Sequence, residues 1–235
     1  MSDTLNLPVE LIDRCRWVTP KNSGWLQYQL NQKELDFIGK CIEKSHQKKK
    51  SINPTLAGNI SNSLELEDTQ DWFFENTLYP LTLIYGQEFG NKGKSAPIID
   101  NHPYRLWTWW VNYQKKHEFN PIHDHSGVYS FVIWLKIPTE HKDQNKGYVT
   151  NTPTKSAFCF HYTDILGHFQ THYYQLGKEW EGTLLFFPST LKHEVYPFYN
   201  CDEDRISISG NIFIDEYTSF GDANNNERLI SISAK

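Results

Sequence analysis

The sequence predicts a mainly β (α+β) protein, in which a closed or sandwiched antiparallel sheet carries a helical N-terminal layer. Aromatic residues make up 15% of the chain, which favours strands and a core filled by rings over a bundle of Leu-rich helices. After Gly90, short aromatic and β-branched runs alternate with Gly, Pro, Asn and Asp clusters, as strands alternate with turns. Because 235 residues fit one hydrophobic core, we expect a single domain over 1–235, with a mostly helical support layer at 1–90 and the β core at 91–235.

Two segments of the N-terminal layer have helical spacing of apolar residues. The first, NQKELDFIGKCIEK, starts at Asn31, which can form a capping box with Glu34. The basic run at 48–50 is expected to close it, since cations complement the negative end of a helix dipole. The second, DWFFENTLYPLTLIYGQEF, follows Asp68 as a candidate cap, and Pro80 breaks or restarts it. Both helices are expected to cover one face of the sheet.

Seven or eight short strands are expected after Gly90. The Trp-rich strand with Trp107, Trp109 and Trp110 is expected to form core and barrel wall. No fixed-period repeat and no long linker interrupts the pattern, so no domain boundary is needed. The runs are YRLWTWWVNYQ, VYSFVIWLKIP, AFCFHYT, THYYQL, GTLLFFPS, KHEVYPFY and RISISGNIFID.

Composition restricts the partners and the compartment. The net charge of −5 and the single basic run at 48–50 argue against a nucleic-acid partner. The four cysteines are too far apart in sequence for a zinc ribbon or redox motif, so we expect reduced thiols. No apolar run reaches the ~20 residues that span a bilayer, and the polar start MSDTLNLPVE is unlike a signal peptide. We therefore expect a cytoplasmic protein without membrane contact, and leave a homodimer open.

The segment NPIHDHSG is the strongest candidate for a metal site. His123 and His125 are separated by one residue, so in an extended chain their side chains leave the same face about 7 Å apart and can converge on one metal. His193, in LLFFPSTLKHEVYPF, is the candidate third ligand from another strand. Imidazole suits Fe, Zn, Cu and Ni, so the ligand type alone does not choose the metal.

A candidate anion clamp follows His193 in the chain. If the segments on either side of YNCDED form a hairpin, Arg205 returns beside the strand of His193, and Ser207 shares its face. A guanidinium in an apolar barrel is a forked donor for a carboxylate. A dicarboxylate that chelated the metal at one end would need such a clamp at the other.

These segments resemble a known family. NPIHDHSGVYSFVIWLKIP, FHYTDILG, GTLLFFPSTLKHEVYPF and DRISISGNI are similar to the 2-oxoglutarate and Fe(II)-dependent oxygenases common in marine cyanophages, within the prolyl-hydroxylase-like superfamily. The resemblance implies a double-stranded β-helix (a jelly-roll or cupin-like barrel), with Fe(II) at the barrel mouth and 2-oxoglutarate and O₂ as co-substrates. It also implies that Arg205 and Ser207 hold the distal carboxylate. The expected reaction is hydroxylation of a small molecule or a protein side chain, in the host cytoplasm for a phage protein.

One position departs from the pattern of the family. Its iron site usually has Asp or Glu two residues after the first His, whereas here His125 stands there. We favour His123, His125 and His193 as ligands and catalytic centre, because Asp124 points to the opposite face of a regular strand. Asp124 remains the alternative acidic ligand if the backbone is irregular. Asn112 is a further candidate for binding 2-oxoglutarate.

Two other classes of protein fit parts of the pattern. A cupin-like metalloprotein would bind metal through the same histidines without 2-oxoglutarate, and Arg205 would then pair with an acid of Asp202-Glu203-Asp204. A non-catalytic jelly-roll binding or virion protein would carry the histidines incidentally. Bound metal would distinguish the non-catalytic jelly-roll protein from the oxygenase and the cupin-like metalloprotein. Binding of 2-oxoglutarate would distinguish the oxygenase from the cupin-like metalloprotein.

Overall fold

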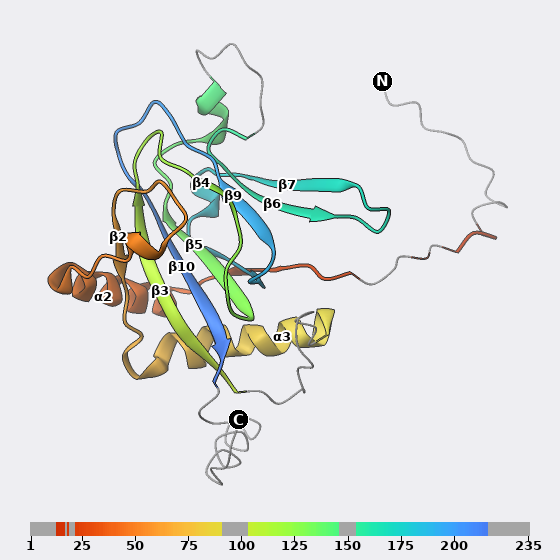
Figure 1. The fold of residues 1–235 in the computed structure, drawn as a ribbon, viewed down its shortest axis with the longest axis horizontal. Coiled ribbons are helices and arrows are strands. Elements are labelled where there is room, and N and C mark those ends of the chain that lie inside the picture. Colours follow the sequence, from red (N-terminus) through yellow and green to blue (C-terminus); the bar gives the residue numbers. More distant parts are fainter. Residues whose placement is uncertain (1–12, 17, 19–21, 91–102, 146–153, 216–235) are drawn as a thin grey trace, which may run out of the picture.

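The protein folds into two antiparallel sheets, as a computed structural model shows for residues 13–16, 18, 22–90, 103–145 and 154–215 (Figure 1). One sheet has six strands and the other four, and every strand pairing is antiparallel. This arrangement confirms the predicted mainly β double-stranded β-helix. The six-stranded sheet has the order β1 (Leu26–Gln29), β8 (Thr183–Pro188), β5 (Tyr129–Lys136), β10 (Arg205–Ile214), β3 (Tyr104–Gln114) and β2 (Ser63–Glu65). The four-stranded sheet has the order β4 (Asn120–His123), β9 (Lys192–Val195), β6 (Ala157–Thr163) and β7 (Phe169–Gln175).

The first helix begins and ends where its capping residues predict. Helix α2 spans Gln32–Lys48, and Asn31 and Glu34 form the expected capping box, each side chain accepting from the backbone N–H of the other. The helix ends at Lys48 because Lys49 adopts a left-handed conformation with φ 52°. Glu34 is buried and also accepts a hydrogen bond from Thr77 Oγ1 at 2.7 Å, which ties the two helical segments together.

The second helical segment begins at Asp68, whose carboxylate accepts hydrogen bonds from the N–H groups of Phe73 and Phe74. A 3₁₀ turn (Thr69–Asp71) and a π-helix (Phe74–Leu78) precede helix α3 (Tyr79–Phe89). Pro80 lies in the first turn of α3, and the backbone stays helical from the π-helix into α3, so Pro80 marks the change from π-helix to α-helix and does not break the helix.

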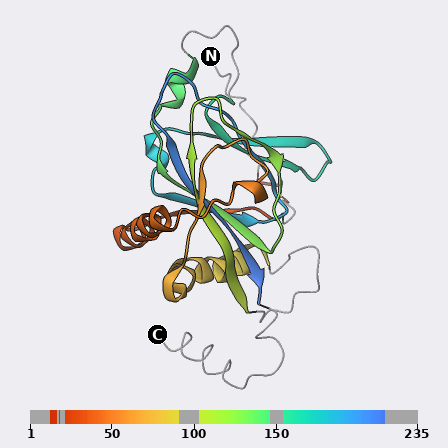
Figure 2. The same ribbon diagram turned by 60° about the vertical axis from the view of Figure 1, so that its left-hand side comes forward.

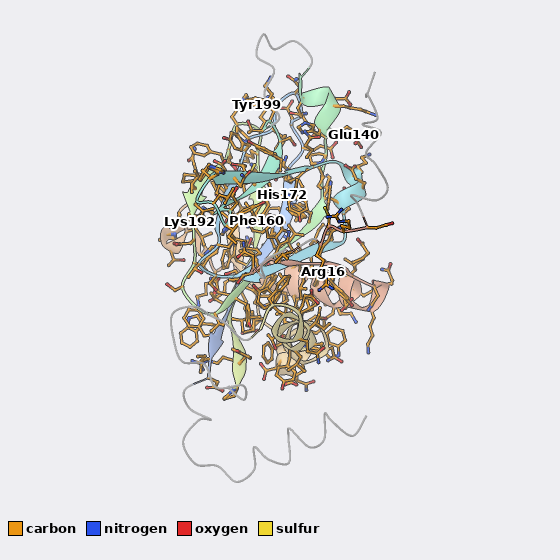
Figure 3. All side chains as sticks on the ribbon, turned by 90° about the vertical axis from the view of Figure 1, so that its right-hand side faces the viewer. Arg16, Glu140, Phe160, His172, Lys192 and Tyr199 are labelled. Carbon is orange, nitrogen blue, oxygen red and sulfur yellow. The ribbon has the colours of Figure 1, made fainter. Side chains whose placement is uncertain are left out.

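Strands β5 and β8 of the six-stranded sheet divide their side chains between two cores. Residues of one parity face α2 and α3, which cover the outer face of this sheet (Figures 1 and 2). On β5, for example, Phe131 and Ile133 pack on the helical side, whereas Val132 and Trp134 face the four-stranded sheet. The alternation follows from the two-residue period of a strand and creates an interior between the sheets.

The predicted strands correspond to the observed ones, with three additions and two errors. All seven runs contain a strand, but the sequence patterns missed β1, β2 and β4 as strands. The predicted hairpin between the segments of His193 and Arg205 is wrong, since β9 and β10 lie in different sheets. Trp109 and Trp110 are buried as expected, but Trp107 is 57% exposed because it points away from both cores. The single-domain organisation stays a prediction.

Two further expectations concern thiols and membranes. The four cysteines form no disulfide, and Cys41 and Cys159 are buried. Among the described residues, no helix is long and apolar enough to cross a membrane. The polar start at 1–10, used to argue against a signal peptide, lies outside the described residues.

Candidate metal centre

Three histidines converge at the end of the four-stranded sheet. His123 ends β4 and is the register partner of His193 on β9, so the two rings lie on one face with centroids 4.3 Å apart. His125 follows just after β4, and its ring centroid is 5.0 Å from each of the other two. One nitrogen from each ring lies within 4.8 Å of the other two nitrogens. The histidines singled out by the H-x-H spacing and the distant His therefore come together.

The hydrogen bonds of the His123 and His193 rings leave their Nε2 atoms available as ligands. His123 Nδ1 lies 2.7 Å from the carbonyl oxygen of Pro121, and His193 Nδ1 lies 2.9 Å from that of Leu191. Because a carbonyl can only accept, each Nδ1 must donate, and the lone pair of each neutral ring is then on Nε2. Nε2 of His125 lies 3.2 Å from Nε2 of His193, close to the spacing of two nitrogens that share a metal at about 2.0–2.1 Å each.

Burial keeps the three rings neutral, as metal ligation requires. It lowers the pKa of His125 to about 4, with a smaller contribution from His123. Burial also lowers the pKa of His123, although the Pro121 carbonyl opposes the shift. The pKa of His193 falls well below its ordinary value because the side chain is buried among Phe158, Phe160 and Phe187 and lies beside the other two rings.

This cluster predicts that the metal-free protein loses stability in mild acid. The unfolded chain takes up protons on these histidines near pH 6.5, whereas the folded chain takes them up only near pH 4 at His125. Stability is therefore full above pH 6.5 and falls as the pH drops towards 4, by up to about 1.4 kcal/mol per pH unit for each such group. Thermal unfolding of the metal-free protein at pH 7 and pH 5 measures this loss of stability, which should be smaller in His125→Gln than in the wild type. An equal loss of stability in the two proteins would contradict the prediction.

Asp124, the alternative ligand, does not join the cluster. Its carboxylate Oδ2 pairs with Lys192 Nζ at 2.5 Å, and both side chains are substantially exposed. This ion pair lowers the pKa of Asp124, which therefore stays ionised at the surface. Lys192 precedes His193 on β9, so the pair lies on the face of the two strands opposite the histidine rings.

The cluster opens into a cavity between the sheets, whose empty space is about 760 Å³ when the open solvent at its mouth is included. Both sheets and the segment 53–60 line it. Gly58 of that segment lies so close to the Asn120 carboxamide that a side chain there would require the Asn120 side chain to move. The polar and charged groups of the lining include His123, His125, His193, Arg205, Ser207, Asn112 and Gln114.

Arg205 lines the same cavity and is only 1% exposed. Its Nη2 donates to the hydroxyl and, at 3.2 Å, to the carbonyl oxygen of Ser156, while Nη1 donates to Gln114 Oε1 at 3.4 Å. Phe198 packs on the guanidinium, with its ring centre 4.9 Å from Cζ. Among the described residues no carboxylate pairs with Arg205, and its Nε has no hydrogen-bond partner. Burial alone lowers the pKa of Arg205 to about 9.

Ser207 and Asn112 lie beside Arg205 on the inner face of the six-stranded sheet. Ser207 is two residues along β10 and is the register partner of Asn112 on β3. The Asn112 Oδ1 accepts a hydrogen bond from Ser63 Oγ at 2.7 Å, which leaves its Nδ2 as a donor towards the cavity. Arg205 therefore reaches the cavity as predicted, but from the opposite sheet to His193.

Two residues that contact Arg205 were not predicted from the sequence. Gln114 could have been predicted, because it lies two residues after Asn112 on β3 and its side chain therefore leaves the same face of the strand. Ser156 carries no such signal, since it precedes β6 in a turn and is brought to Arg205 only by the tertiary fold.

Comparison with protein families assigns a chemistry to this geometry. Residues 108–211 match the family model described as "Putative 2OG-Fe(II) oxygenase". Over these residues the chain is similar to 2OG-Fe(II) oxygenases. The protein is thus an oxidoreductase that uses Fe(II), 2-oxoglutarate and O₂. The matched residues include all three histidines, Asn112, Ser207 and Arg205.

Solved structures of such enzymes are similar at low identity. A Pseudomonas putida prolyl-4-hydroxylase is 14% identical with a TM-score of 0.47, over 82% of this chain and 94% of its own. A Trichoplax adhaerens prolyl hydroxylase, in complex with a hypoxia inducible factor peptide, is 12% identical with a TM-score of 0.48, over 89% and 87%. The carbocyclase SnoK from nogalamycin biosynthesis is 11% identical with a TM-score of 0.48, over 89% and 85%. No curated protein sequence matches the chain.

Proposed function

We propose that His123, His125 and His193 hold Fe(II) through Nε2, and that Arg205 and Ser207 hold the distal carboxylate of 2-oxoglutarate in the same cavity. The observation that carries this proposal is the guanidinium of Arg205, which is buried without a carboxylate partner among the described residues. A buried charge without a partner is strongly unfavourable, so an anionic ligand should complete the site.

A dicarboxylate fits both ends of the cavity. One end offers a metal on three neutral imidazoles, which can chelate a 2-oxo acid, and the other end offers a forked donor. The Ser207 hydroxyl and the Asn112 amide add uncharged hydrogen-bonding groups to the lining of the cavity. No acidic side chain is among the described residues that line the cavity, so nothing there repels the ligand.

Three neutral ligands would leave the iron with its full double positive charge, one unit more than a site with a carboxylate ligand. Iron, when bound, supplies the oxygen chemistry, and the chain supplies position and exclusion of water. The buried aromatic side chains Phe158 and Phe187 serve this exclusion, since both line the cavity beside His193.

Hydroxylation of a small molecule or a protein side chain is the reaction we propose for this site. A marine cyanophage origin, a homodimer and the absence of a nucleic-acid partner stay predictions from the sequence.

The cupin-like alternative requires Arg205 to be a structural partner of a nearby acid. The acids on its N-terminal side pair elsewhere, because Asp202 pairs with Lys116 at 2.6 Å and Glu203 with Lys136 at 2.7 Å. Asp204 forms no ion pair with Arg205. Arg205 therefore has no structural partner of the kind that the alternative needs.

The third ligand is tested by comparing two neighbours in sequence. Anaerobic wild-type protein with Fe(II) should develop a metal-to-ligand charge-transfer absorbance on addition of 2-oxoglutarate. His125→Ala should lose most of the bound iron and this absorbance, whereas Asp124→Ala should keep both, because Asp124 contributes only an exposed ion pair. The reverse result would make Asp124 the ligand, and a wild-type protein without the absorbance would contradict the proposed function.

A further inference from the structure

We infer that Ser156 and Gln114 are positioning residues that hold Arg205 through uncharged acceptors only, and so keep its charge available for the co-substrate carboxylate. The inference rests on the proposed function and names the residues behind the clamp. The structural basis is a buried guanidinium held on two sides, by a turn before β6 and by the end of β3.

Ser156 makes the stronger of the two contacts. Its hydroxyl and its carbonyl oxygen both accept from Nη2 of Arg205, and the residue is completely buried. Its backbone has φ 62°, a left-handed conformation that a serine adopts at some cost. The Ser156 N–H donates to Pro197 O at 2.9 Å, which fixes the turn in the position where both oxygens face the guanidinium.

Gln114 supports the guanidinium from β3. Its Nε2 donates to Glu118 O at 2.6 Å, and this bond turns Oε1 towards Nη1 of Arg205. Gln114 and Arg205 are register partners at the ends of β3 and β10, so the pairing of the two strands sets their separation. An acid of the same shape at 114 would neutralise the guanidinium from within the protein.

The uncharged surroundings have a functional consequence. A buried Arg with a fixed acid would already be neutralised, and a ligand carboxylate would then have to compete with that acid. With neutral acceptors, the guanidinium is oriented but has no anionic partner among the described residues, and its Nε and part of Nη1 remain to donate. The two residues should therefore affect recognition of the distal carboxylate and leave the metal end unchanged.

Two 2-oxo acids distinguish chelation at the metal from recognition of the distal carboxylate. 2-Oxopentanoate has the chain length and the chelating group of 2-oxoglutarate but lacks the distal carboxylate. In the anaerobic Fe(II) protein, the charge-transfer absorbance gives the affinity for each compound. The ratio of the two affinities then reports only on recognition of the distal carboxylate, and a general structural defect would weaken both compounds alike.

Ser156→Gly accepts the left-handed backbone but removes the hydroxyl, and should lower the ratio by about tenfold, the effect of one hydrogen bond to a charged group. Gln114→Glu should lower it by at least as much, because the new carboxylate occupies the guanidinium. Gln175→Glu, at an exposed position on β7, is the matched control and should leave the ratio unchanged.

Thermal unfolding of the metal-free proteins adds a readout that needs no iron. Saturating 2-oxoglutarate should raise the melting temperature of the wild type and raise that of Gln114→Glu much less. If both variants keep the wild-type ratio of affinities while 2-oxoglutarate binding still depends on Arg205, this inference is overturned and the proposed function stands. Wild-type protein with no preference for 2-oxoglutarate over 2-oxopentanoate would instead overturn the proposed function.

Discussion

His193→Ala should remove the bound iron almost completely. His193 is the deepest of the three candidate ligands and the one that β9 brings to His123 and His125. Replacing a residue that hydrogen-bonds to a metal ligand lowers metal affinity by about 10–100-fold, and removing a ligand itself should lower it further. Iron per chain, measured after anaerobic loading with one equivalent of Fe(II) and desalting, should fall from near one to near zero.

His161→Ala is the matched control for the loss of a buried histidine. His161 lies on β6 next to β9, but its ring contacts Glu194 and Thr171 on the other face of the sheet. The variant should lose stability and keep its iron, so metal loss and unfolding are told apart by circular dichroism of both proteins. Unchanged iron in folded His193→Ala would contradict the three-histidine site.

Arg205→Ala should weaken 2-oxoglutarate binding by well over tenfold without changing iron content. Removing one partner of a buried charge pair costs about 2–5 kcal/mol, because the other charge is left in a poorly solvated site. Arg205→Lys should recover only part of the affinity, since an ammonium cannot donate two parallel hydrogen bonds to one carboxylate. Titration of 2-oxoglutarate into the anaerobic iron protein, followed by the charge-transfer absorbance, measures both variants.

The stability of an Arg205→Met variant tests the same residue independently of the ligand. If Arg205 belonged to a structural ion pair, its loss would destabilise the fold by about 3–5 kcal/mol. Because no acid among the described residues pairs with it, Met should be tolerated or should stabilise the ligand-free protein. If wild type and Arg205→Ala bind 2-oxoglutarate with equal affinity, Arg205 does not hold its distal carboxylate. Arg105→Ala is the control, because Arg105 lies on the same pair of strands, β3 and β10, but does not line the cavity.

Arg205 shows how a site for a ligand can be unfavourable for the empty protein. The guanidinium is buried and oriented by Ser156 and Gln114 but not neutralised by them. Such a group lowers the stability of the ligand-free state, and binding of a carboxylate then returns that free energy as affinity. The same reasoning explains why local rules of sequence and structure fail most often at functional sites.

The sequence by itself determined the local structure of this protein. Asn31 with Glu34, and Asp68, define where helical segments begin, because capping acts within one helical turn. The aromatic runs define the strands, because a two-residue period is visible without knowledge of the neighbours. The spacing of His123 and His125 marked the candidate centre for the same reason, since both residues leave one face of a short segment.

Only the tertiary structure decided which segments meet across the interior. His193 pairs with His123 through β9 and β4, while Arg205 enters the cavity from the opposite sheet and not through a hairpin with β9. Ser156 reaches Arg205 through a turn in which no residue pattern predicts a contact. Strand pairing between distant segments depends on the packing of two sheets over a shared core, and the local sequence does not contain that information.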